Sequence, residues 1–383
     1  MKHQLPIADI LSENFTADFH RNSEEIGFNA VANASTDPRF SIDGKTIEEQ
    51  KILLYKDLRE FADLPESEKE KIDRWAEGQR GYTGLWVEKS GELWELRTHL
   101  MTAGVLPEGH PLNDYRKDGF YLPNVKIPQI PTLIPRAEQL AQSMEKLTLY
   151  TAEQLEKYLD IPNGTMAAPL AYGQYFIRLH IYPKPDEVIG ARVLNGVEAI
   201  GGTKVDGVEV VDIIHNGKRH NNILRASPHP DIGLITWLLG SESPGLYIQM
   251  KDGSALPFTT DPGKIVANSA DFIKYIHRRF QKYESTIHWV GMNEESAKKD
   301  RLSIADFVHT RPMFIINNNR TGAEFLYDRL YEINHLDIKT RDNLIAASKN
   351  YPKDDEMILR ILRWEEKQLI KDKSFEPKLM KYY

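Results

Sequence analysis

The chain has 383 residues, 41% of them hydrophobic, which is enough for one large domain or two ordinary ones with a sizeable core. Its formal charge of −7 at pH 7 argues against nucleic-acid binding, which needs clusters of basic residues to neutralise phosphates. There is no cysteine, so disulfides, thiolate zinc sites and cysteine nucleophiles are excluded. Any metal must be held by histidine and carboxylate side chains.

The N-terminal sequence MKHQLPIADILSENF does not resemble a secretory signal, because it lacks a long apolar core and carries acidic residues early. No stretch of the chain reaches the roughly 18 apolar residues that a membrane span requires. We therefore expect a cytoplasmic protein with neither a membrane nor a nucleic acid as its partner.

Residues 1–130 have the pattern of a mixed α/β region. Short strands are expected at 5–10 and 28–34, separated by a helix over 14–26 that Gly27 ends. Apolar spacing predicts a second amphipathic helix over 46–64 and a further helix over 137–159.

From residue 172 to about 317 the pattern becomes one of short β-branched or alternating runs between Gly, Pro and Asp clusters, which is typical of a sandwich, barrel or jelly roll. The expected strands lie at 174–182, 234–239, 245–250, 264–273, 285–290 and 301–309. A long glycine-containing excursion over 186–227 interrupts them, and VEVVDII followed by HNGK predicts a hairpin within it. Residues 321–383 return to charged helical spacing.

His229 and Asp231 are the first candidate metal ligands. In an extended backbone, residues i and i+2 project to the same side, and Pro230 favours the extended conformation of His229. Such a pair taken alone is more often a surface hydrogen bond than a metal site.

His288 completes a possible site, because it lies on another β-like run that an antiparallel barrel can bring beside His229 and Asp231. Two histidines and one carboxylate on one face leave three positions open, which suits non-haem Fe(II) that must bind a chelating substrate and dioxygen. Zinc is the rival metal, although a zinc hydrolase needs one open position and a nearby general base.

Arg301 and Ser303 form a candidate anion site on the run RLSIADF. Arg301 is either a surface residue on an edge strand or, given its apolar neighbours, a residue that points inward, where an unpaired guanidinium is costly. A bound carboxylate would satisfy it with two parallel hydrogen bonds, and the Ser303 hydroxyl could donate a third.

These motifs resemble the isopenicillin N synthase-like family of Fe(II)- and 2-oxoglutarate-dependent oxygenases. The matching stretches, in the family's order, are LPIADI, EEIGFNAVANA, FADLPESEKEKI, QRGYTG, IRLHIYPKP, PHPDIGLITWL, PGLYIQMKDG, DPGKIVANSADFI, STIHWV and RLSIADF. The resemblance covers about residues 4–315 and implies a mixed α+β fold with a double-stranded β-helix (jelly-roll) core. The implied domains are an N-terminal α/β region at 1–130, the oxygenase core at 131–320 with its insertion at 186–227, and a helical C-terminal extension at 321–383.

The resemblance also implies the roles of individual residues. Iron would be held by His229, Asp231 and His288, and the 2-oxoglutarate carboxylate by Arg301 and Ser303. The further candidates are Tyr182 and His180 beside the co-substrate, and Phe307, a core aromatic or a substrate contact. The insertion and the C-terminal helices exceed the family's common core, so they are candidate lids or homodimer surfaces.

The expected reaction is oxidation (hydroxylation, desaturation or ring formation) of a small polar or amino-acid-derived metabolite, with 2-oxoglutarate and O2 consumed and succinate and CO2 released. The alternatives are a 2-oxoglutarate-independent iron oxidase of the isopenicillin N synthase type and a catalytically silent binding protein. Arg225, with His215 and His220, is either a contact for a charged substrate or a solvated loop residue.

Overall fold

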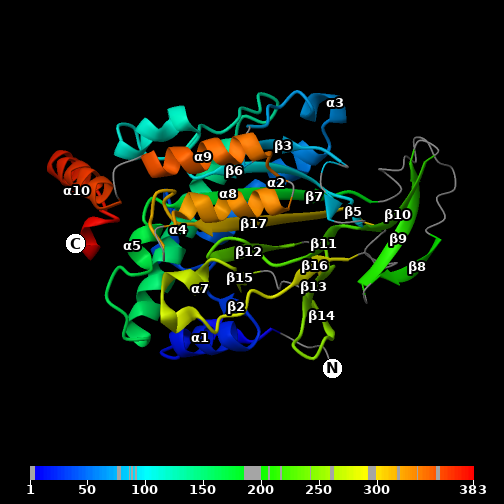
Figure 1. Ribbon diagram of the computed structural model, residues 1–383, viewed down its shortest axis with the longest axis horizontal. Coiled ribbons are helices and arrows are strands. Elements are labelled where there is room, and N and C mark those ends of the chain that lie inside the picture. Colours follow the sequence, from blue (N-terminus) through cyan, green and yellow to red (C-terminus); the bar gives the residue numbers. More distant parts are fainter. Residues whose placement is uncertain are drawn as a thin grey trace.

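The computed structural model describes residues 5–75, 79–85, 87, 89–90, 93–184, 200–205, 208–215, 218–241, 243–258, 263–291, 299–316, 320–333, 335–350 and 354–383. Its centre is an eight-stranded sheet (Figure 1). In spatial order the strands are β1 (Ile7–Asp9), β2 (Phe28–Ala32), β15 (Ile265–Ser269), β12 (Ile235–Ser241), β17 (Arg301–His309), β7 (Gln174–Tyr182), β6 (Thr98–Ala103) and β3 (Gly81–Thr83). The N-terminal strands therefore extend the same sheet as the strands that follow residue 172.

The two faces of this sheet differ because side chains alternate along each strand. On β17, Leu302, Ile304 and Val308 are buried in the main hydrophobic core. On β12, Trp237 belongs to the same core, and its indole N–H donates to Thr148 Oγ1 of helix α4 (Leu133–Tyr158) at 2.9 Å. This face is thus apolar and covered by α4, so the intervening residues must face the other side.

A smaller sheet lies against that other side. It comprises, in order, β11 (Ala226–His229), β16 (His288–Val290), β13 (Leu246–Gln249) and β14 (Ala255–Phe258), all paired antiparallel. Residues of both sheets line one cavity, so the core of the fold is two sheets facing each other, consistent with the expected jelly roll.

The expected strand over 264–273 is too long. β15 ends at Ser269, and the chain then turns because three successive backbone N–H groups donate to carbonyls of the loop after β11. Asp271 N donates to Asp231 O at 2.9 Å, between bonds from Ala270 to Leu234 and from Phe272 to Gly233. The turn thereby fixes the backbone that carries Asp231.

The expected N-terminal helices are present, and local sequence explains their ends. Gly27 follows the first helix at φ +78°, and a Cβ there would lie 2.3 Å from the Glu284 carbonyl oxygen. Thr46 and Glu49 form a capping box at the start of the second helix. Up to residue 280, the helices among the described residues are α1 (Phe15–Glu25), α2 (Ile47–Ala62), α3 (Glu66–Lys69), α4, α5 (Ala167–Leu170) and α7 (Ile273–Ile276), with 3-10 turns η1 (Pro38–Phe40), η2 (Pro111–Asp118) and η3 (Arg278–Phe280).

The excursion over 186–227 contributes to a third sheet, whose order is β4 (Lys89–Ser90), β5 (Leu93–Glu95), β10 (Lys218–Leu224), β9 (Val208–His215) and β8 (Ile200–Val205). β9 and β10 pair antiparallel, so the expected hairpin is confirmed. These strands lie at the end of the molecule opposite the C-terminus (Figure 1). Residues 185–199 lie outside the described residues, so a lid role for this part of the excursion stays a prediction.

The described C-terminal residues form the helices α8 (Gly322–Glu332), α9 (Ile338–Asn350) and α10 (Asp354–Lys371), followed by the turn η6 (Met380–Tyr382). Glu365 of α10 is fully buried and holds the chain end. Its carboxylate accepts from the Tyr172 hydroxyl at 2.7 Å and from the backbone N–H groups of Lys378, Leu379 and Met380.

Candidate active site

A cavity of about 330 Å³ lies between the two facing sheets. Strands β6, β7, β11, β12, β16 and β17 contribute side chains to its wall, and so does helix α8. Its volume is at the lower end of the range for small-molecule sites.

The three candidate metal ligands converge in this cavity. Strands β11 and β16 place His229 directly opposite His288, and Asp231 follows two residues after His229. Nε2 of each histidine lies 3.8 Å from an Asp231 carboxylate oxygen, and the three donor atoms are within 4.8 Å of one another. The expected convergence of the three side chains is thus confirmed.

The hydrogen bonds of the two imidazoles fit a metal. His229 Nδ1 lies 2.6 Å from the Ser227 carbonyl and His288 Nδ1 lies 3.1 Å from the Thr286 carbonyl. Since a carbonyl only accepts, each Nδ1 carries a proton, and in the neutral form of each ring Nε2 is the bare nitrogen. Two nitrogen lone pairs and a carboxylate then face one point, which is favourable only if a cation lies between them.

Burial and hydrogen bonding favour the required protonation states. Burial lowers the pKa of His288, so its ring stays neutral near pH 7. Burial alone would raise the pKa of Asp231, but the adjacent His288 and His229 and hydrogen bonds from Thr236 and Asn268 hold that pKa below its usual value. Asn268 Nδ2 donates to Asp231 Oδ2 at 2.7 Å and so orients the carboxylate.

Arg301 lies in the same cavity and is 4% exposed, so it points inward and is not a surface residue. Its guanidinium carbon lies 4.9 Å from the centre of the Tyr182 ring. Within the described part of the chain, Arg301 Nε and Nη1 have no hydrogen-bond acceptor. Two buried donors without a partner are costly, and an anionic ligand with two oxygens would satisfy both.

The other expected co-substrate residues lie next to Arg301. Tyr182 is directly opposite Arg301 in the sheet, and His180 is directly opposite Ser303. The His180 and Tyr182 rings are stacked, with centroids 5.5 Å apart. All four side chains line the cavity.

The substrate candidates have different positions. Phe307 is partly exposed and lines the cavity. Arg225 is fully buried, is not part of the cavity lining, and donates to the Lys299 carbonyl at 2.5 Å. Burial, with Arg301 nearby, lowers its pKa to about 10. The side chains of His215 and His220 lie outside the described residues.

Several lining residues were not expected from the sequence. Arg178 faces the cavity from the middle of β7, and Leu326, Arg329, Leu330 and Ile333 reach it from the region of α8. The i, i+2 alternation applied to QYFIRLHIY places Arg178 on the same face as His180 and Tyr182, so this residue could have been found. The α8 residues carry no comparable local signal.

Comparison with known proteins supports the interpretation of this cavity as an oxygenase active site. Residues 209–310 match the family model described as the 2OG-Fe(II) oxygenase superfamily. This segment of the chain, which carries the three candidate metal ligands and Arg301, is therefore similar to that superfamily. The match and the shared fold are consistent with the isopenicillin N synthase-like family inferred from the motifs, and together with the His229–Asp231–His288 cluster they support a dioxygenase that uses iron and 2-oxoglutarate.

Solved structures share the fold of this oxygenase. A Caulobacter crescentus protein described as belonging to the 2OG-Fe(II) oxygenase family is 22% identical, with 85% of this chain and 98% of that chain covered and a TM-score of 0.61. A Shewanella oneidensis protein described as an oxygenase is 21% identical, with 87% and 99% covered and a TM-score of 0.58. A full-length Neurospora crassa protein, solved in complex with α-ketoglutarate and thymine, is 17% identical, with 82% and 87% covered and a TM-score of 0.57.

Curated protein sequences gave no significant match. None of the helices in the described part of the oxygenase is long and apolar enough to cross a membrane.

Proposed function

We propose that His229, Asp231 and His288 hold Fe(II), and that Arg301 and Ser303, beside Tyr182 and His180, bind the distal carboxylate of 2-oxoglutarate. The observation that carries this assignment is that one cavity contains a set of acceptors without a cation and a pair of buried donors without an anion. Three acceptors converge on a point that requires a cation, and Arg301 presents two buried donors that require an anion. Fe(II) and a dicarboxylate co-substrate would satisfy both groups together.

The bound iron would supply the activation of dioxygen, and the protein would supply position and shelter. The Ser227 and Thr286 carbonyls set the orientation of the two imidazoles, and Asn268 sets that of Asp231. Arg301 would hold the far end of the co-substrate, which directs its 2-oxo acid end toward the triad. Asp231 and His288 are buried between the two sheets, which would limit the access of bulk water on their side of the site.

The proposed substrate is a small molecule that is oxidised beside Phe307. A cavity of about 330 Å³ has room for the co-substrate and a small partner and is too small for a folded macromolecule. Thymine in the Neurospora crassa complex is a ligand of this size class. The proposed oxidation is a hydroxylation, a desaturation or a ring formation.

The division at residues 130 and 320 and a homodimer through the C-terminal helices are further proposals. Sedimentation of the intact chain tests the proposed homodimer. Leu359 is an exposed residue of α10, so Leu359→Glu would place a charge in the dimer interface and should convert the dimer to a monomer. A monomeric wild-type protein would contradict it.

The test of the function is conversion of 2-oxoglutarate to succinate under air by the Fe(II)-loaded protein, measured with and without candidate substrates. Succinate should form with wild type and be abolished in Asp231→Ala, because one of three protein ligands is lost. Consumption of dioxygen without succinate would instead favour the 2-oxoglutarate-independent oxidase.

A further inference from the structure

The two histidines of the candidate metal site differ in how closely the protein packs around them. The His288 side chain is 8% exposed, and its ring meets the Phe28 ring edge-on with centroids 5.5 Å apart. The His229 side chain is 40% exposed. Packing therefore restricts the His288 ring more, and the orientation of His229 depends more on the hydrogen bond from its Nδ1 to the Ser227 carbonyl.

The backbone at Ser227 lies in an irregular part of β11. Ala226 and His229 both pair with β16, but the three steps between them on β11 correspond to two steps on β16. An extra residue of this kind interrupts the ladder of hydrogen bonds and redirects the side chains beside it. Pro228 has no N–H to donate, and the N–H of Ser227 needs an acceptor from elsewhere in the protein.

Glu95 supplies that acceptor. Its Oε1 accepts from Ser227 N at 2.8 Å, and both residues are buried. Glu95 belongs to β5, which pairs in parallel with β10 so that Glu95 lies opposite Leu224, and β11 begins two residues later. The last strand of the long excursion therefore holds Glu95 beside the irregular backbone. A hydrogen bond to a buried carboxylate is among the stronger kinds.

Arg97 fixes the other side of this carboxylate. Arg97 is also buried and forms an ion pair with Glu95, which makes a buried charge tolerable. The Glu95 carboxylate is thus held between a guanidinium and the Ser227 N–H. Both residues of the ion pair line the cavity, as Ser227 and His229 do.

We propose that Glu95 is a positioning residue for the candidate iron ligand His229. The contacts run from the Glu95 carboxylate to the Ser227 N–H, and from the Ser227 carbonyl to the His229 ring. Glu95 fixes the irregular backbone, and the carbonyl then keeps the proton of the neutral ring on Nδ1 and directs Nε2 toward the triad. This inference rests on the proposed function, because it takes His229 as an iron ligand.

Two substitutions separate the reach of Glu95 from its charge. Glu95→Asp keeps a carboxylate for Arg97 but is one methylene shorter, about 1.5 Å, so it falls short of Ser227 N. Glu95→Gln keeps the length and an acceptor oxygen and removes the charge. A positioning role makes Glu95→Asp the more harmful change, whereas a role limited to neutralising Arg97 makes Glu95→Gln the more harmful one.

The first measurement is the zinc affinity of the metal-free protein, titrated against a competing chelator. Zinc does not react with dioxygen, so binding is read without turnover. Glu95→Asp should lower the affinity by about tenfold or more, and Glu95→Gln should stay within about threefold of wild type. The loss caused by Glu95→Asp should persist in a His288→Ala background and disappear in a His229→Ala background, because Glu95 acts through His229.

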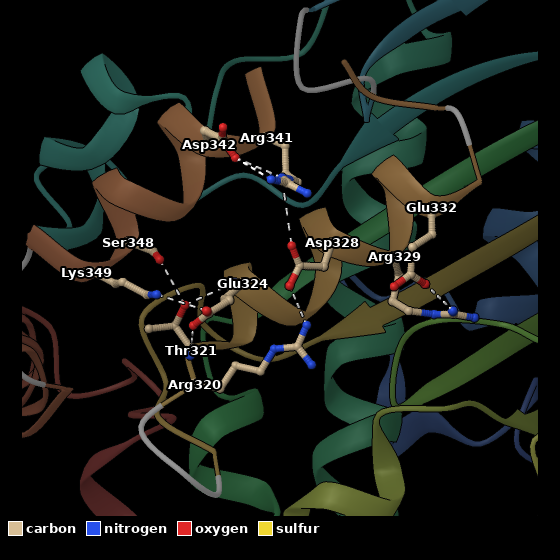
Figure 2. A network of polar contacts seen from close by, with 10 residues as sticks. All are labelled: Arg320, Thr321, Glu324, Asp328, Arg329, Glu332, Arg341, Asp342, Ser348 and Lys349. Carbon is tan, nitrogen blue, oxygen red and sulfur yellow. Dashed lines mark hydrogen bonds and ion pairs between the residues drawn. The ribbon is translucent and has the colours of Figure 1, made fainter. Parts of the chain in front are cut away.

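Glu324 of α8 provides the matched control. Its carboxylate also accepts from a backbone N–H, that of Thr321, and also pairs with a cation, Lys349, as Figure 2 shows. Glu324 is not one of the described residues that line the cavity. Glu324→Asp should therefore lose comparable contacts and leave the zinc affinity unchanged.

The second measurement is side-chain ¹⁵N NMR of the histidines in the metal-free protein at pH 8, above the ordinary histidine pKa of about 6.5. In wild type, His229 and His288 should both carry their proton on Nδ1. In Glu95→Asp, His229 should become a mixture of the two tautomers while His288 is unchanged. A general structural role of Glu95 would not single out His229.

Equal zinc affinity in wild type and Glu95→Asp, a greater loss in Glu95→Gln than in Glu95→Asp, or an unchanged His229 tautomer would overturn the proposal. If Asp231→Ala does not lower the zinc affinity of the wild type, the proposed function itself fails, which is a different outcome. The tautomer measurement needs no metal and still decides the role of Glu95 in that case.

Discussion

Replacement of Arg301 with methionine tests the co-substrate anchor. Met keeps an unbranched apolar stem against the Tyr182 ring and removes the guanidinium of a residue that is 4% exposed. Two donors of that guanidinium have no acceptor among the described residues. We expect affinity for 2-oxoglutarate to fall sharply and the ligand-free protein to be no less stable. The substitution would leave no buried hydrogen-bond acceptor unsatisfied among the described residues, so it should not lower the stability of the ligand-free protein.

The magnitude follows from the loss of a buried bidentate charge pair, which costs about 2–5 kcal/mol, or on the order of 30-fold to several thousand-fold in Kd. At 2-oxoglutarate equal to 100 times the wild-type Kd, the ligand stabilises the wild type by about 2.7 kcal/mol. If the variant's Kd is raised about 100-fold, the same concentration stabilises it by only about 0.4 kcal/mol.

The assay is thermal or urea unfolding of the zinc-loaded protein with and without 2-oxoglutarate, together with calorimetric titration. Arg360→Met, an exposed position, serves as the matched control. Unchanged affinity for 2-oxoglutarate in Arg301→Met would refute the assignment. A marked loss of stability in the ligand-free variant would show that Arg301 already has a partner within the protein.

Three further outcomes are expected. Asn268→Ala should lower iron affinity by about 10- to 100-fold in a metal titration, because Asn268 orients the Asp231 carboxylate, and unchanged affinity would contradict this role. Glu365→Gln should lower the free energy of unfolding by about 2–3 kcal/mol, because an amide replaces a buried carboxylate that accepts three backbone N–H groups, whereas the exposed Glu366→Gln should have little effect. In His110→Asn the free energy of unfolding should fall less steeply than in the wild type as the pH is lowered below 6.5. Burial lowers the folded-state pKa of His110 from 6.5 to about 3, so below pH 6.5 the unfolded state binds a proton that the folded state does not, and stability falls as pH falls. At pH 5 the variant should escape a penalty of about 2 kcal/mol, while an identical slope in both proteins would argue against a neutral buried His110.

The parts of the site that the sequence predicts are those set by strand alternation. His229 and Asp231 share a face because they are two residues apart, and Arg301 and Ser303 share a face for the same reason. The antiparallel pairing of β11 with β16 then brings His288 opposite His229. The succession of short strands in the sequence, which is typical of a small barrel, permits this arrangement. Arg178 was missed, although the same alternation along β7 places it two residues from His180.

The parts that sequence reasoning could not reach depend on tertiary packing. Helix α8 carries an ordinary amphipathic pattern, and nothing in that pattern says whether its apolar side meets the hydrophobic core or a cavity. Arg225 was a substrate candidate because it is polar and near the metal motif, but burial against the Lys299 carbonyl is a property of the folded structure. The end of β15 at Ser269 is likewise fixed by hydrogen bonds to the loop after β11, far away in sequence.

The most direct test of the central claim is an anaerobic titration of the Fe(II)-loaded protein with 2-oxoglutarate, followed by visible absorption. A weak charge-transfer band should develop and saturate at one equivalent in wild type, require far more 2-oxoglutarate in Arg301→Met, and be absent in Asp231→Ala. Iron bound at full occupancy without any band on addition of 2-oxoglutarate would contradict the account.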